Sequence, residues 1–157
     1  MNLSDILIQD HIDVKKLLQA YRNADSLSKC RAVFSKLATK LTQHFYQEEK
    51  ALIVYLNAGG RINENFSNAL FTQHDAIMAS LDRWEHELGA GKETSPEALD
   101  QIELKLEQHI AFEMESLYEG FDALLDERQK ELVAEAIAQT QNMQTFPLKA
   151  DRKSLKS

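Results

Sequence analysis

Residues that form turns or cross-links are scarce in this chain of 157 residues, which has five glycines, two prolines and one cysteine. So few glycines and prolines leave little room for loops. The single cysteine, Cys30, cannot form an internal disulfide, so nothing indicates an oxidising compartment. No stretch alternates apolar and polar residues as a half-buried strand would. These absences favour an all-helical protein.

Positive charge and long apolar runs are also lacking. The net charge of −7 argues against nucleic-acid binding, which requires a basic face. No apolar run approaches the roughly 20 residues of a membrane span. The N-terminus carries Asp5 and Asp10 without the basic flank of a signal peptide. We therefore expect one domain located in the cytoplasm, with neither a nucleic acid nor a membrane as its partner.

Helical periodicity dominates the chain. Apolar residues recur every three or four positions in four long segments and one shorter segment. The expected helices cover residues 4–24, 28–57, 63–88, 94–120 and 126–141. Short connections between long helices favour antiparallel neighbours. The sequence therefore predicts an all-α, antiparallel up-down-up-down four-helix bundle with a short C-terminal fifth helix packed across an end or side.

The expected domain occupies residues 1–145, and residues 146–157 form a basic tail that we expect to be mobile. Start and stop signals support the helix limits. The pair Gly59-Gly60 follows the second helix, and Ser95-Pro96 provides a cap and a first-turn proline for the fourth.

A repeated histidine pattern is the most informative feature. His44 and Glu48 are four residues apart, which places them on one face of a helix, and His109 and Glu113 repeat this spacing. A further histidine precedes each pair, 63 residues apart, whereas the pairs are 65 residues apart. A lone histidine on an apolar face is usually a core residue, but the repeat favours metal ligation. The six candidate ligands are His11, His44, Glu48, His74, His109 and Glu113.

Helix length predicts that these six side chains share one layer. With about 1.5 Å of rise per residue, His11 lies roughly 10 Å from the start of its helix. His74 lies roughly 17 Å from the start of its helix, and the two pairs lie roughly 17 and 13 Å from the ends of theirs. In an up-down-up-down bundle, all four positions are measured from the same end. The six residues should therefore meet inside the bundle.

Four imidazoles and two carboxylates suit a pair of first-row transition metals. Mg²⁺ and Ca²⁺ prefer oxygen ligands, and structural zinc sites often use thiolates. Burying a glutamate in an apolar stripe is costly unless it is paired or binds a metal. We therefore expect two iron ions, ahead of manganese or zinc. If both glutamates bridge, positions stay open for water, an oxo or hydroxo bridge, or a small ligand such as O₂.

On these residues the chain resembles the hemerythrin-like, or HHE cation-binding, domain family, over about residues 4–140. The resemblance implies a four-helix bundle with a non-haem di-iron centre, and it gives the six residues named above the ligand roles. Oxygen-carrying members have another histidine where Met78 stands and an aspartate five residues after the helix-four histidine, whereas Glu113 follows His109 by four. The pattern is closer to HHE domains of iron–sulfur-cluster repair, nitric-oxide response and iron or oxygen sensing. The repair proteins carry a cysteine-bearing N-terminal segment that this sequence does not show.

Three functional classes compete. The first is a di-iron module that binds or senses O₂, NO or iron, and it needs only the six ligands and open positions. The alternative is a di-iron redox enzyme, either oxidase-like, peroxidase-like or active in iron-centre repair. A metal-free interaction bundle is disfavoured by the inward glutamates. A ferritin-like site is disfavoured because no histidine follows a glutamate by three residues.

Neighbouring polar residues are expected to face solvent. Glu49 is turned by about 100° from Glu48 along the helix, so we expect it to be solvated, and we place Gln47 and His86 on exposed faces as well. Asp10 and Asp75 are adjacent in sequence to expected ligands. Adjacency alone does not place either side chain beside the neighbouring imidazole.

Overall fold

The computed structural model describes residues 3–57, 64–115, 125–141, 143 and 152, and within them it contains five helices. These are α1 (Leu3–Arg22), α2 (Leu27–Asn57), α3 (Glu64–Gly89), α4 (Pro96–Glu113) and α6 (Glu127–Thr140). The expected limits of α1, α2 and α6 agree with the structure within two residues. The sequence predicts that the fourth helix continues to residue 120, whereas α4 ends at Glu113 with Met114 as its C-cap, and residues 116–120 lie outside the described residues. The Gly59-Gly60 stop and all of the expected tail except Arg152 also lie outside them.

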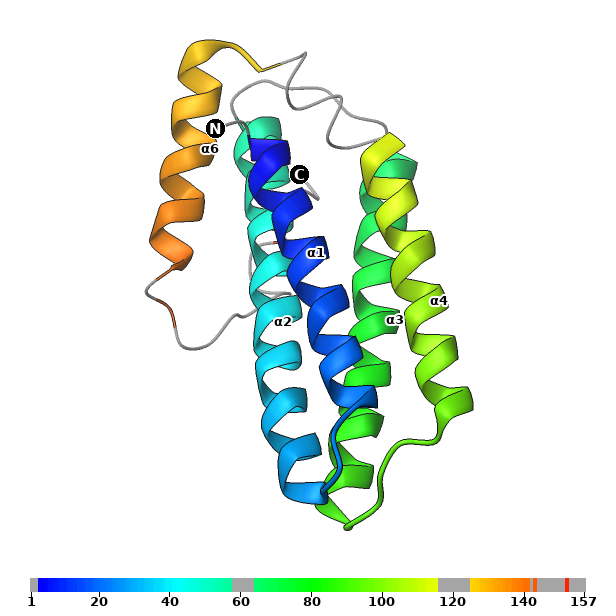
Figure 1. Cartoon of the computed structure of the whole chain (residues 1–157). Helices are drawn as coiled ribbons and strands as arrows, with labels where there is room; N and C mark the ends of the chain where they lie inside the picture. Colours follow the sequence, from blue (N-terminus) through cyan, green and yellow to red (C-terminus); the bar gives the residue numbers. More distant parts are fainter. Residues whose placement is uncertain (1–2, 58–63, 116–124, 142, 144–151, 153–157) are drawn as a thin grey trace.

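The four long helices run alternately up and down (Figure 1), which confirms the predicted bundle. α6 lies alongside α2, outside the four-helix core, and so packs on a side of the bundle. Ion pairs join the end of α1 to the first turns of α4. The Arg22 guanidinium lies 2.9 Å from Asp100 and 2.8 Å from Glu103. No helix among the described residues is long and apolar enough to cross a membrane.

Local capping explains where two helices begin. The Ser95 side chain accepts a hydrogen bond from the backbone N–H of Ala98, and Pro96 occupies the first helical turn. Asp126 forms a capping box with Gln129 at the start of α6. After α3, Gly91 has a φ of 81°, a left-handed conformation that glycine adopts without a Cβ penalty.

The apolar core is divided into two clusters along the bundle. One cluster contains Leu41 and Phe45 of α2 and Ile77 of α3, and it extends along the bundle to the aromatic group around Trp84. The other contains Leu52 of α2 and Leu70 of α3, and it is covered in part by α6. On α2, His44 and Glu48 lie where one cluster gives way to the other, and His74 does so on α3. A polar layer therefore separates two apolar regions, which hold the surrounding backbone in place.

The packing of α6 also corrects one prediction from the sequence. Gln47 was expected on an exposed face, but its side chain is buried, and its Nε2 donates a hydrogen bond to Thr140 Oγ1 at 2.9 Å. The prediction was wrong because α6 covers this face of α2, and residues 93 positions apart in the chain meet there.

Candidate metal centre

The structure brings all six predicted ligands together in the polar layer. α1 supplies one histidine, α3 supplies one, and α2 and α4 each supply a histidine and a glutamate. His11 is 8% exposed, and each of the other five side chains is at most 2% exposed. Donor atoms on four different helices therefore share one buried space at the centre of the bundle.

The donor atoms fall into two groups. The first joins His11 and His44 with Glu113, and within it the donor atoms lie within 4.8 Å of one another. The second meets the same limit and takes its four donors from Glu48, His74, His109 and Glu113. Glu113 belongs to both groups. Two neighbouring positions for a metal ion would thus share one carboxylate.

The two oxygens of Glu113 face different groups. Oε2 lies 3.6 Å from Nε2 of His11 and 3.8 Å from Nε2 of His44. Oε1 lies 3.7 Å from Nε2 of His74 and also contacts Nε2 of His109. Because each oxygen addresses a different pair of imidazoles, Glu113 has the geometry of a bridging carboxylate.

Glu48 occupies a similar intermediate position. Its Oε1 lies 3.1 Å from Nε2 of His44 and 3.3 Å from Nε2 of His74. These imidazoles belong to different donor groups. Both glutamates of the repeat therefore lie between the two halves of the site.

Three of the imidazoles form a hydrogen bond through Nδ1, the ring nitrogen on the side away from the centre of the site. The acceptors are Asp10 Oδ2 for His44 at 3.0 Å, Glu49 Oε2 for His74 at 2.6 Å and Gln73 Oε1 for His109 at 2.6 Å. A carboxylate or amide oxygen only accepts, so Nδ1 must carry the hydrogen in each case. Nε2 of each ring then faces the centre, and in a neutral ring its lone pair is available there for a metal.

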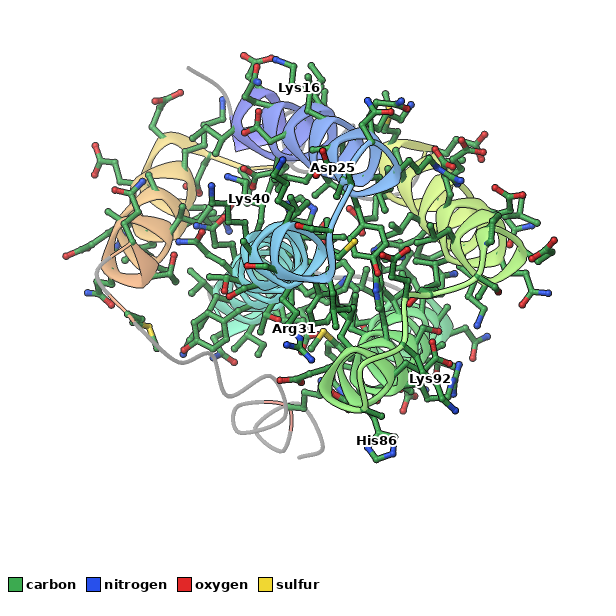
Figure 2. The ribbon with its side chains drawn as sticks, turned by 60° about the horizontal axis from the view of Figure 1, so that its bottom comes forward. Lys16, Asp25, Arg31, Lys40, His86 and Lys92 are labelled. Atoms are coloured by element: carbon green, nitrogen blue, oxygen red, sulfur yellow. The ribbon has the colours of Figure 1, made fainter. Side chains whose placement is uncertain are left out.

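A basic side chain forms an ion pair with each of the two carboxylates, Asp10 and Glu49, that accept these hydrogen bonds. Lys40 Nζ lies 2.7 Å from Asp10 Oδ1, and Lys40 lies between α1 and α2 (Figure 2). Arg152 makes two contacts with Glu49, of 2.6 Å from Nε to Oε1 and 2.7 Å from Nη2 to Oε2. Each half of the centre therefore contains one chain of cation, carboxylate and histidine.

The sequence interpretation misplaced or missed these outer residues. Glu49 was expected to be solvated, but it is 2% exposed, because its turn away from Glu48 directs it at His74 on α3. Asp10 contacts His44 on the next helix. Adjacency to His11 in the sequence was the only signal for Asp10, and it does not place the Asp10 side chain beside any imidazole. Gln73 had no signal, because its partner is 36 residues away.

Two further residues of α3, His86 and Met78, differ in their surroundings. His86 is exposed as expected, and it projects away from α3 in Figure 2. Met78 is half-buried, packs against the apolar cluster near Trp84, and accepts a hydrogen bond from Thr42 Oγ1 at 3.8 Å. Phe45 lies against the site, with its ring stacked on His74 at 4.2 Å between centroids.

Burial and charge shift the protonation equilibria of the metal-free site in opposite directions. Burial lowers the pKa of His109 to about 3 despite the neighbouring Glu113 carboxylate. Burial also disfavours charge on His74, but the neighbouring carboxylates of Glu113, Glu48 and Glu49 raise its pKa to about 10. Burial and repulsion from Glu113 raise the pKa of Glu48. Protons therefore compete with any cation for this layer.

The residues present fit metal ions. Nε2 of His74 and Nε2 of His109 are buried, and neither forms a hydrogen bond of good geometry within the described part of the chain. Leaving such atoms unsatisfied is costly, whereas a cation between them and the two carboxylates would use all these donors together. Nitrogen and carboxylate donors in these numbers suit first-row transition metals.

The protein-family model of the hemerythrin HHE cation-binding domain matches residues 2–143 of this chain. Neither the curated proteins nor the solved structures gave a match.

Proposed function

Since the chain belongs to the hemerythrin HHE cation-binding domain family, whose members bind metal ions and typically iron, we propose that it holds two iron ions that bind or sense O₂ or NO, or respond to iron supply. The observation that carries this proposal is the pair of donor groups that share Glu113. A single group would support one ion, whereas two groups at one carboxylate support a coupled pair.

The residues divide between two positions. His74 and His109 would hold one ion, and His11 and His44 would hold the other. Glu113 would contribute one oxygen to each position, and Glu48 lies close enough to His44 and His74 to join either or both. This arrangement uses all six residues predicted from the sequence repeat.

Iron bound there would supply a redox-active Lewis acid able to take a diatomic ligand. The protein contributes orientation and exclusion of water. Asp10, Glu49 and Gln73 fix three imidazoles, and the two apolar clusters close the layer from above and below. Because no ligand side chain is more than 8% exposed, a diatomic molecule is a better fit than a large organic substrate.

The test compares two glutamates on α4 and the turn that follows it. Protein produced with ample iron should contain close to two iron ions per chain, and its spectrum should change when O₂ or NO is added under controlled anaerobic conditions. Glu113→Gln should lose most of the metal, because it removes a charged oxygen from both positions. Glu115→Gln is the matched control, since Glu115 is exposed and lies two residues later.

Equal metal content in the two variants would contradict the proposed site. A wild-type content near one, or metal that is not iron under iron-rich conditions, would contradict the di-iron assignment. Two irons with no spectral response to either gas would instead favour the response to iron supply.

A further inference from the structure

The two outer carboxylates of the centre are supported in different ways. Asp10 is paired with Lys40, which lies on α2, the same helix as His44. Glu49 is paired with Arg152, which lies 103 residues further along the chain. Arg152 also lies beyond residues 2–143, the part that matches the family model. Its contact with the centre is thus a feature of this chain outside the matched domain.

Arg152 is held in place by several contacts. Its guanidinium meets both oxygens of Glu49, at 2.6 and 2.7 Å, and both oxygens of Asp75, each at 3.0 Å. It also lies over the ring of Phe71, 4.6 Å from the centroid. A planar guanidinium suits this paired recognition of carboxylates, whereas a lysine would act as a point charge.

The contact continues from Arg152 to a candidate ligand. Glu49 Oε2 accepts a hydrogen bond from His74 Nδ1 at 2.6 Å, and the same oxygen lies 2.7 Å from Arg152 Nη2. Glu49 is 2% exposed, so water cannot easily replace a lost partner. The position of the carboxylate, and with it the orientation of the imidazole, depends on the guanidinium.

We propose that Arg152 is a positioning residue for the metal centre: through Glu49 it fixes His74, and so tunes the metal position formed with His109 while leaving the position formed by His11 and His44 largely unaffected. This inference rests on the proposed function for its metal-binding consequence. The position of the His74 ring itself can also be tested in the metal-free protein.

The main experiment titrates full-length protein with Co²⁺ and follows its visible absorption. Loss of an outer partner typically lowers metal affinity by about 10- to 100-fold. Arg152→Gln should therefore lower the affinity for one of the two ions by about tenfold and leave the affinity for the other unchanged. Arg152→Lys should recover part of the lost affinity. The matched control is Arg128→Gln, which removes the same charge from an exposed position on α6.

A double-mutant cycle tests whether Arg152 acts through Glu49. If it does, Glu49→Gln combined with Arg152→Gln should bind Co²⁺ no more weakly than Glu49→Gln alone. In the metal-free protein, proton NMR should show a far-downfield, slowly exchanging Nδ1–H of His74. That signal should be lost or exchange faster in Arg152→Gln, and it should persist in Arg128→Gln.

Three outcomes would overturn the inference: the same Co²⁺ affinities in Arg152→Gln and Arg128→Gln, equal weakening of both ions, or full additivity in the cycle. Failure of the wild-type protein to bind two ions would overturn the proposed function instead. The His74 proton signal would then decide the inference, and an unchanged signal in Arg152→Gln would reject it.

Discussion

The two halves of the candidate centre have the same ligand pattern but different surroundings. Each half has two histidines, and each His-x-x-x-Glu pair contributes one glutamate between the halves. His44 is supported by Asp10 and Lys40 on neighbouring turns of α1 and α2, whereas His74 is supported by Glu49 and a distant arginine, and His109 by the amide of Gln73. The comparison shows that a repeat of ligands does not imply a repeat of their outer partners. The halves can therefore differ in metal affinity even though the sequence presents them as equivalent.

Metal removal should have the largest effect because it disrupts both halves together. At ligand concentrations near 1,000 times the dissociation constant, binding contributes about 4 kcal/mol of stability. A domain of this size should then melt roughly 8–16 °C lower after chelation. Calorimetry of loaded and verified metal-free protein would measure this change. Coincident melting curves would show that the buried carboxylates and imidazoles are satisfied without metal.

Ligand substitutions should separate the two halves. His11→Ala leaves the four-donor group with His74 and His109 intact, so about one ion should remain per chain. Glu113→Gln affects both groups and should leave less than one. Elemental analysis of both variants would measure the difference. If His11→Ala loses both ions, the second ion depends on the first and the halves are not independent.

Outer carboxylates should have a smaller, position-specific effect. Asp10→Asn and Glu49→Gln should each lower the affinity for one ion by about 10- to 100-fold, and the weakened ion should differ between the variants. Stepwise Co²⁺ titration would measure both affinities. The exposed residue Glu115 supplies the control, as Glu115→Gln. Identical effects of the two outer substitutions would show that the halves respond as one unit.

Proton release should further distinguish His74 from His109. His74 has a pKa of about 10 without metal, so at pH 7 it carries a proton on Nε2 that metal binding must displace. His109 has a pKa of about 3 and is already neutral at pH 7. Metal affinity should therefore rise with pH above 7, by up to tenfold per pH unit for one released proton. Zn²⁺ titration in weak buffer with a pH indicator would count the protons, and no net release at pH 7 would contradict these assignments.

Met78 should have the smallest effect. Its sulfur accepts a hydrogen bond from Thr42 and its side chain packs against the apolar cluster, so it is not needed as a ligand. Met78→Leu nearly conserves volume and should cost less than about 1.5 kcal/mol in stability. Metal content should stay at two, as measured by elemental analysis. Loss of one ion in Met78→Leu would show that the thioether contributes to the centre.

The sequence by itself determined the helices and the inward direction of the six candidate ligands. Both follow from local rules, because 3.6 residues per turn aligns His44 with Glu48, and rise per residue fixes their depth. The same periodicity places Leu41 and Leu52 on that face, and the structure buries both. These features need only a regular helix and the antiparallel order that short connections favour.

Only the tertiary structure decided which residues form the outer hydrogen bonds of the candidate ligands and their partners. Asp10 meets His44 across 34 residues, Gln73 meets His109 across 36, and Arg152 meets Glu49 across 103. Such pairings depend on how packed helices are rotated and offset against one another. A change in rotation or offset equivalent to one residue would change every partner. Helical phase gave the correct direction of Glu49 relative to Glu48, but not the neighbour on α3 and the arginine beyond the bundle that bury it. Periodicity measures angles within one helix, whereas burial depends on what packs against it.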